Sequence, residues 1–216
     1  MEKVLLIGIT GNFGSGKSTV AKIIENEGYP VINSDRLAKD LMEKNQKLRK
    51  QIEKTFGKES YQLDGSLNSK WLANIVFAST PEAEQNLMKL NSIVHPFVLD
   101  EAKKQINQLI ENGNYLIFFE SALIYEANIE NLFDYIILVH ARKEKVIERL
   151  TSQGKYTSEE IEHRLSKQID SEVKRKFADF TIINDGTIEE LEKNVMFVLE
   201  MIKELQKVGK KSRNNN

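Results

Sequence analysis

Five short apolar runs are spaced along the chain, each with the length of a buried strand. They cover residues 4–9, 29–32, 114–119, 134–139 and 180–183. Segments with apolar positions at helical spacing lie between and after these runs, for example residues 19–27 and the final stripe through Leu191, Val195, Val198, Leu199, Ile202 and Leu205. Nearly continuous apolar strands that alternate with helices are typical of a parallel sheet buried on both faces. The pattern therefore predicts an α/β fold of three layers around five parallel strands.

The turn after the first apolar run has the sequence of a phosphate-binding loop. Residues 11–18 read GNFGSGKS, which fits G-x-x-x-x-G-K-[ST] at every fixed position. Glycines let the backbone curl around an anion, and the N-terminus of the next helix directs N–H groups at phosphates. Lys17 is expected near the β- and γ-phosphates of ATP, and the Ser18 hydroxyl as a ligand of Mg²⁺. A chance match in a glycine-rich turn is the alternative. The predicted nucleotide-binding residues are Gly11, Asn12, Phe13, Gly14, Ser15, Gly16, Lys17, Ser18 and Thr19.

The composition narrows the class of protein. The chain has 216 residues, of which 40% are hydrophobic and 29% charged, and its net charge is −1. These values predict one globular domain and no general attraction to nucleic acid or to an anionic membrane. The absence of cysteine excludes disulfides and thiolate metal sites. Without a long apolar stretch or a signal peptide, we expect a cytoplasmic protein with no membrane association, as a monomer or weak homo-oligomer.

Asp35 follows the second apolar run, where strand ends line the site of a doubly wound sheet. It is interpreted as the base for an acceptor hydroxyl, or as a group that helps to hold Mg²⁺. The alternative is an N-cap for a helix that starts at Arg36. Residues 41–111 are polar and mainly helical, and they predict an insert that covers the acceptor.

Two further candidate residues stand at element boundaries. His95 precedes Pro96, so the sequence predicts a helix that starts here, with Pro96 as its first residue. A single histidine is more often structural than functional. Glu120 ends the third apolar run, where P-loop enzymes often place an acid near the metal's water shell. Its alternative role is that of a solvated strand end.

Residues 142–177 form a basic segment with little apolar content. Ten cations lie there against seven acids: Arg142, Lys143, Lys145, Arg149, Lys155, Arg164, Lys167, Lys174, Arg175 and Lys176. We interpret this segment as a lid whose arginines stabilise the transferring phosphoryl group. Two solvated helices are the alternative. The core is then expected over residues 1–40, 112–141 and 178–206, with a polar tail over 207–216.

The sequence also indicates which kind of P-loop protein this is. The chain contains neither the N-K-x-D segment nor the D-x-x-G switch of a GTPase. A small domain with a P-loop, a helical insert and a basic lid fits a small-molecule phosphotransferase that uses ATP. These features leave the acceptor open.

From Ile7 to the last helix, the chain resembles the dephospho-CoA kinase family. The resemblance rests on Gly8-Ile9-Thr10-Gly11, on Asp35-Arg36-Leu37-Ala38-Lys39, on His95-Pro96-Phe97-Val98, on Leu123-Ile124-Tyr125-Glu126, on Arg149, Arg164 and Gln168, and on Ala178-Asp179 with Ile183-Asn184-Asp185-Gly186. It departs from the family pattern at Asn12-Phe13, Asn33, Ala122 and Gln153.

The resemblance implies transfer of phosphate from ATP to the 3′-hydroxyl of the dephospho-CoA ribose, the last step of coenzyme A synthesis. It implies that Asp35 is the base, that Lys17 and Arg149 act on the phosphates, and that Asn184 lies near the adenine. His95, Glu120 and Arg164 are the expected substrate-binding residues. Two alternatives stay open: a kinase for a nucleoside, a nucleoside monophosphate or shikimate, and a regulatory protein that binds ATP without transferring phosphate.

Overall fold

We describe the protein from a computed structural model, in which residues 3–78, 80–154 and 156–211 are placed. The chain divides into two compact units. One comprises the described residues up to Ile32 and from Gln108 onward, and the other spans Asn33–Asn107. The second unit thus begins earlier than the insert expected at residue 41, and it includes Asp35.

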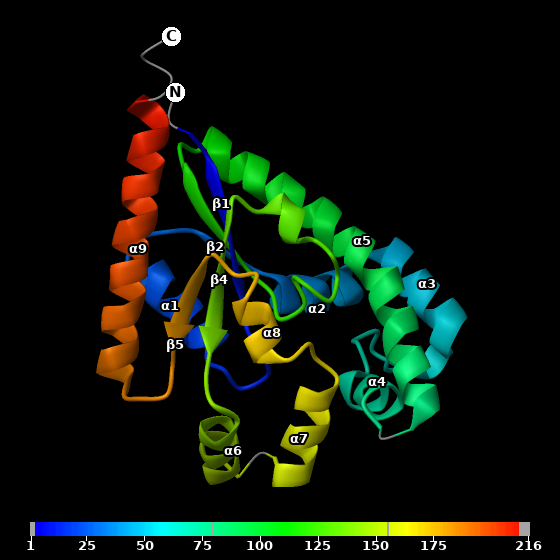
Figure 1. The fold of residues 1–216 in the computed structure, drawn as a ribbon. Helices are drawn as coiled ribbons and strands as arrows, with labels where there is room; N and C mark the ends of the chain where they lie inside the picture. The colour runs from blue at the N-terminus through cyan, green and yellow to red at the C-terminus, as the bar shows by residue number, and fades with distance from the viewer. Residues whose placement is uncertain (1–2, 79, 155, 212–216) are drawn as a thin grey trace. The chain divides into compact units, whose positions relative to one another are not determined.

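A five-stranded sheet forms the centre of the first unit (Figure 1). Its strands follow the order β2-β3-β1-β4-β5. The pairs β1/β3, β1/β4 and β4/β5 are parallel. The strand bounds are Leu5–Thr10 for β1, Val31–Asn33 for β2, Leu116–Glu120 for β3, Tyr135–His140 for β4 and Phe180–Ile183 for β5. The predicted α/β fold is confirmed, and each strand lies at or within two residues of an apolar run.

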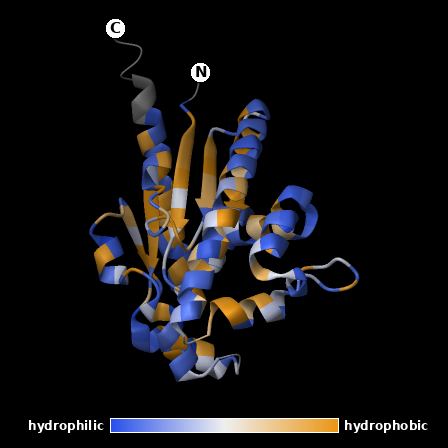
Figure 2. Cartoon of the chain, turned by 90° about the vertical axis from the view of Figure 1, so that its right-hand side faces the viewer, coloured by the Kyte–Doolittle hydropathy of each residue, from blue (hydrophilic) through white to orange (hydrophobic). Residues whose placement is uncertain are grey.

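Helices α1 (Lys17–Asn26) and α9 (Ile188–Lys211) pack together beside the sheet. Their buried side chains share one apolar cluster with the strands, and that cluster includes Ile7, Val20, Val139 and Val195. Figure 2 shows the strands as the most apolar part of the chain, with α9 apolar along only part of its surface. Full burial of each such side chain stabilises the fold by roughly 1.5–3 kcal/mol. The predicted stripe of α9 therefore faces the core from Leu191 to Ile202, whereas its last member, Leu205, is exposed.

Two segments cover part of the other face of the sheet. The first follows β3 and contains the 3₁₀ helix η2 (Glu130–Leu132). Its side chains Ile124 and Phe133 lie so close to Gly8 that a Cβ there would be 2.8 Å from Ile124 Cδ1. The second segment is α8 (Ser171–Arg175), which packs on β4. Helices α6 (Lys143–Ser152) and α7 (Ser158–Ser166) precede it in the chain.

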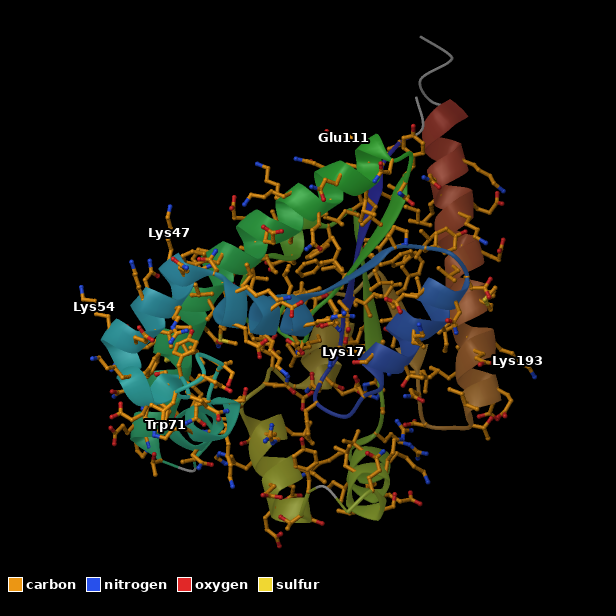
Figure 3. The ribbon with its side chains drawn as sticks, turned by 180° about the vertical axis from the view of Figure 1, so that it is seen from behind. Lys17, Lys47, Lys54, Trp71, Glu111 and Lys193 are labelled. Atoms are coloured by element: carbon orange, nitrogen blue, oxygen red, sulfur yellow. The ribbon has the colours of Figure 1, made fainter. Side chains whose placement is uncertain are left out.

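The second unit is helical. It contains α2 (Ser34–Lys44), α3 (Gln46–Phe56), the 3₁₀ helix η1 (Lys58–Ser60), α4 (Ser69–Val76), which carries Trp71, and most of α5 (Pro81–Glu111) (Figure 3). Arg49 links these parts because its guanidinium lies 4.4 Å from the centre of the Tyr61 ring and donates to Gly65 O at 3.0 Å. Tyr61 Oη in turn donates to Met42 O at 2.8 Å.

Two interpretations of helix starts are wrong. His95 and Pro96 lie inside α5, so no helix starts at Pro96. Asp35 does not cap α2: the helix starts at Ser34, and the Asn33 side chain accepts a hydrogen bond from the Arg36 N–H at 2.8 Å. The helix α9 extends to Lys211, so part of the predicted tail is helical, and residues 212–216 lie outside the described residues. Among the described residues, no helix combines the length and the apolar character needed to span a bilayer.

Candidate active site

The candidate site lies at the carboxyl end of β1, between the neighbouring strands β3 and β4. The chain leaves β1 toward β2 on one side of the sheet, and the later strands β4 and β5 lie on the other side. In open α/β sheets, ligands bind where the strand order reverses in this way. The P-loop, residues 11–18, connects β1 to α1 at this position, and Figure 3 shows Lys17 where α1 begins.

Gly16 shows why the loop needs glycine. Its φ is 95°, which is a left-handed conformation that side-chain-bearing residues rarely adopt. A Cβ on Gly16 would also collide with Asn184 Nδ2. Gly16 is the N-cap of α1 and has no side chain to cap the helix. The first N–H groups of α1 are therefore suited to an anion.

Several polar groups in the loop, and Thr10 directly before it, fit a phosphate ligand. Lys17 is 9% exposed, and its ammonium donates to Asn12 O at 3.3 Å. Among the described residues, Thr10 Oγ1, Asn12 Oδ1 and Ser15 Oγ are buried without a hydrogen-bond partner. The two hydroxyls can donate to a phosphate oxygen, whereas the amide oxygen of Asn12 can only accept and suits a water molecule. Buried polar atoms of this kind call for a partner such as water or a ligand. The loop thus combines a buried cation, a helix N-terminus and polar atoms that still lack a partner.

Ser18 and Glu120 form the second part of the site. The Ser18 hydroxyl donates to Glu120 Oε1 at 3.0 Å, and the Glu120 side chain is buried at the end of β3. Glu120 is therefore not a solvated strand end. Hydroxyl and carboxylate oxygens are the donors that Mg²⁺ prefers. Among the described residues, no three His, Asp or Glu side chains gather into a metal site.

Arg149 and Asn184 complete the surroundings of the loop. The Asn184 side chain donates to Ser15 O at 2.8 Å. The Arg149 guanidinium donates to Asn184 O at 3.0 Å, so α6 is joined to the residue that follows β5. These contacts place two of the predicted nucleotide-binding residues directly beside the P-loop.

Part of the lid segment, residues 142–177, is packed rather than solvated. Side chains of α6 and α7 pack together around Val146 and Ile161, with Phe13 of the P-loop against them. Several of its cations form ion pairs: Arg142 with Asp185, Lys143 with Glu162, Lys145 with Glu148, Lys174 with Glu126 and Arg175 with Glu172. Local pairing therefore accounts for part of the cation cluster, and Lys155 lies outside the described residues.

Comparison with known proteins identifies the family of this chain. The sequence profile described as dephospho-CoA kinase matches residues 5–190. The chain belongs to the dephospho-CoA kinase family. A dephospho-CoA kinase of Carboxydothermus hydrogenoformans is 34% identical over 195 residues, which are 90% of this chain and 93% of that protein.

Two solved structures are similar to this chain. A crystal structure from Thermus thermophilus has a TM-score of 0.74 at 33% identity, and the match covers 93% of this chain and 98% of the other. The dephospho-CoA kinase from Campylobacter jejuni has a TM-score of 0.60 at 27% identity, with 91% and 96% of the two chains covered. Membership of this family makes the chain an ATP-dependent kinase with a P-loop fold.

Two of the residues that were predicted to bind or activate the acceptor belong to the second unit. Asp35 is exposed on the first turn of α2, two residues after the end of β2. His95 is half-buried on α5, between the buried residues Val94 and Val98 of the same helix. Burial lowers the pKa of His95 from its ordinary value of 6.5, because the charged imidazolium loses solvation there.

Two residues near the loop were not among the predicted site residues. Gln168 Oε1 accepts a hydrogen bond from the Phe13 N–H at 2.7 Å. Tyr156 meets the Phe13 ring edge to face, with 5.2 Å between the ring centres. Gln168 was marked by the family pattern alone. Nothing in the sequence marks Tyr156 except that an aromatic residue is rare in a basic segment.

Proposed function

We propose that this protein transfers the γ-phosphoryl group of ATP to the 3′-hydroxyl of the dephospho-CoA ribose, which yields coenzyme A and ADP. The observation that carries the proposal is the Ser18–Glu120 hydrogen bond at the mouth of a complete P-loop, in a chain of the dephospho-CoA kinase family. The transfer breaks the bond between the γ-phosphorus and the bridging oxygen of ADP, and a new bond forms to the acceptor oxygen. The acceptor hydroxyl gives up its proton.

The P-loop residues bind and orient the donor. Lys17, with its buried ammonium, and the N–H groups at the start of α1 hold the β- and γ-phosphates. Arg149 adds a cation beside Ser15 and Asn184, where charge builds up on the transferring group. We assign Asn184, whose side chain donates to Ser15 O, to the binding of the nucleotide.

Ser18 and Glu120 are the residues that would hold Mg²⁺. The hydroxyl supplies a direct ligand, and the buried carboxylate orients that hydroxyl and accepts hydrogen bonds from the water shell. When bound, Mg²⁺ neutralises charge on the β- and γ-phosphates. We assign Glu120 this supporting role in addition to the substrate contact implied by the family resemblance.

Asp35 is proposed as the general base. It is exposed on the first turn of α2, directly after β2, so its carboxylate can receive a proton from an acceptor. We assign His95 and the helical second unit to the binding of dephospho-CoA, and Arg164 to the lid side of the substrate site. These assignments rest on the matching residues of the family pattern.

A panel of acceptors tests the proposal. ADP release would be measured for the purified chain with Mg²⁺ and ATP, in the presence of dephospho-CoA, adenosine, a nucleoside monophosphate or shikimate. We expect only dephospho-CoA to raise ADP release above the rate without acceptor. A rise with another acceptor instead would assign the chain to a different small-molecule kinase reaction. ATP binding without ADP release for any acceptor would favour a regulatory protein.

A further inference from the structure

Phe13 occupies a variable position of the P-loop, yet its side chain packs against the lid segment. Its ring is half-buried and packs against the apolar cluster around Val146 and Ile161. The contact joins a loop at residue 13 to helices more than a hundred residues later in the chain. The phosphate-binding pattern does not require an aromatic side chain at this position.

The Phe13 ring also lies next to a lid arginine. The Arg164 guanidinium carbon is 5.1 Å from the centre of the Phe13 ring and 5.0 Å from the centre of the Tyr156 ring. The two rings meet at an interplanar angle of 87°. A guanidinium within about 6 Å of an aromatic ring centre is attracted by the ring's negative face. The two rings therefore form an aromatic corner, defined here as Phe13 and Tyr156, that holds the Arg164 head group.

The backbone on both sides fixes this corner. The Phe13 N–H donates to Gln168 Oε1 at 2.7 Å, and Asn12 Nδ2 donates to Ile169 O at 3.0 Å. Gly14 faces α6 so closely that a Cβ there would be 2.6 Å from Val146 Cγ1. Phe13 is thus held by its main chain and by its ring, and both contact the segment that carries Arg164.

We propose that Phe13 is a positioning residue. Its ring holds the Arg164 guanidinium at a fixed place relative to the P-loop, where the guanidinium can contact phosphates bound there. An aromatic face attracts a guanidinium without consuming the N–H donors that a phosphate needs. The role of Arg164 in transfer rests on the proposed function, but its placement by Phe13 does not.

Phe13→Leu is the informative substitution, because leucine keeps an apolar side chain in the cluster and removes the aromatic face. We expect the kcat of phosphate transfer to fall about 10-fold to 100-fold, since small misplacements of a catalytic group have effects of this size. ATP affinity, measured by equilibrium binding, should change little because the loop's backbone is kept. Phe13→Trp keeps an aromatic face and should therefore lose less kcat than Phe13→Leu. Wild-type kcat in Phe13→Leu would overturn the proposal.

A double-mutant cycle separates positioning from general packing. In an Arg164→Met background, Phe13→Leu should have no further effect on kcat, because the group that it positions is gone. An equal loss of kcat in both backgrounds would show that Phe13 acts independently of Arg164. Phe197→Ala is the control, since Phe197 is 68% exposed on α9 and should change kcat in neither background.

Hydrogen exchange tests the same placement without any transfer assay. We expect Phe13→Leu to raise amide exchange over α7 and residues 167–170, with α9 unchanged. Unchanged exchange in α7 would overturn the proposal even if kcat fell. If the wild-type chain transferred phosphate to no acceptor, the proposed function would fail, while the exchange measurement would still decide whether Phe13 holds the lid segment.

Discussion

The Ser18 hydroxyl and the Glu120 carboxylate are joined by a 3.0 Å hydrogen bond, although 102 residues separate them in the chain. The bond brings the first turn of α1 to the end of β3. Glu120 is 3% exposed, and a buried carboxylate needs partners to offset its lost solvation. The strand therefore presents Glu120 to the P-loop rather than to solvent, which is the arrangement expected of a group that supports a metal ligand.

Glu120→Gln should weaken the use of Mg²⁺ while the fold is kept. Loss of the carboxylate removes the group that orients the Ser18 hydroxyl, and substitutions of such supporting groups typically cost about 10-fold to 100-fold in metal affinity or activity. The measurement is the transfer rate as a function of Mg²⁺ concentration. Glu204→Gln is the control, because Glu204 lies on the surface of α9. An unchanged Mg²⁺ dependence in Glu120→Gln would remove Glu120 from the metal site.

Asp35→Asn should abolish transfer and leave ATP binding nearly intact. The amide cannot take the proton of the acceptor hydroxyl, and loss of a general base typically lowers the rate about 10²-fold to 10⁴-fold. Lys17→Ala is the contrast, because it removes a phosphate-binding cation and should weaken both ATP binding and transfer. Equilibrium binding of ATP and single-turnover transfer distinguish the two. Near-normal turnover by Asp35→Asn would show that another group accepts the proton.

Lys174→Met should destabilise the fold. The Lys174 side chain is fully buried, and its ammonium lies 2.8 Å from Glu126 Oε1 and donates to Ala122 O at 3.3 Å. Removal of one partner of a buried ion pair typically costs about 3–5 kcal/mol, because the other charge is left buried and unpaired. The free energy of unfolding in urea measures this loss. The surface pair Lys207–Glu204 provides the control, and Lys207→Met should change stability little.

The pair can be tested further with Glu126→Gln. The double variant with Lys174→Met should lose less stability than the sum of the two single variants, since it leaves no unpaired charge. Additive losses would indicate that the two side chains contribute independently of each other.

His95 should make stability depend on pH. Burial lowers the pKa of folded His95 below 6.5, so below pH 6.5 the unfolded chain binds a proton that the folded chain resists. The free energy of unfolding should therefore be unaffected by His95 above pH 6.5 and fall as the pH drops toward the folded pKa. Urea denaturation at pH 7.5 and pH 5.5 should show a smaller decrease for His95→Gln than for the wild-type chain. Equal decreases would contradict this account.

The strands and the P-loop could be predicted because their signals are local. A short apolar run such as residues 134–139 indicates a buried strand, and β4 is found at Tyr135–His140. The motif from Gly11 to Ser18 likewise depends on neighbouring residues, so its position between a strand and a helix followed directly. The family resemblance added the order of the remaining segments.

The helix through Pro96 could not be predicted from local preference. A proline inside a helix costs about 3 kcal/mol or more. Val94, Val98 and Ala102 are buried at intervals of one helical turn along α5. Burial of a valine contributes roughly 1.5–3 kcal/mol, so an uninterrupted apolar face outweighs the proline penalty. Packing of this kind cannot be predicted from the dipeptide His95-Pro96 alone.

The contacts of Phe13 were equally hidden. The loop pattern treats its position as variable, and only the folded chain brings residue 13 to Tyr156 and Arg164. Similarly, the ten cations of the lid segment were equivalent in the sequence. The structure distinguishes Arg149, which contacts Asn184, from Arg142, which pairs with Asp185.

Product analysis of a single reaction tests the central claim most directly. The purified chain would be incubated with Mg²⁺, ATP and dephospho-CoA, and the products followed by mass spectrometry and ³¹P NMR. We predict coenzyme A with its new phosphate on the ribose 3′-oxygen, formed in equal amount to ADP, and no coenzyme A with Lys17→Ala. ADP formation without coenzyme A, or a phosphate on any other oxygen of the acceptor, would contradict the proposed function.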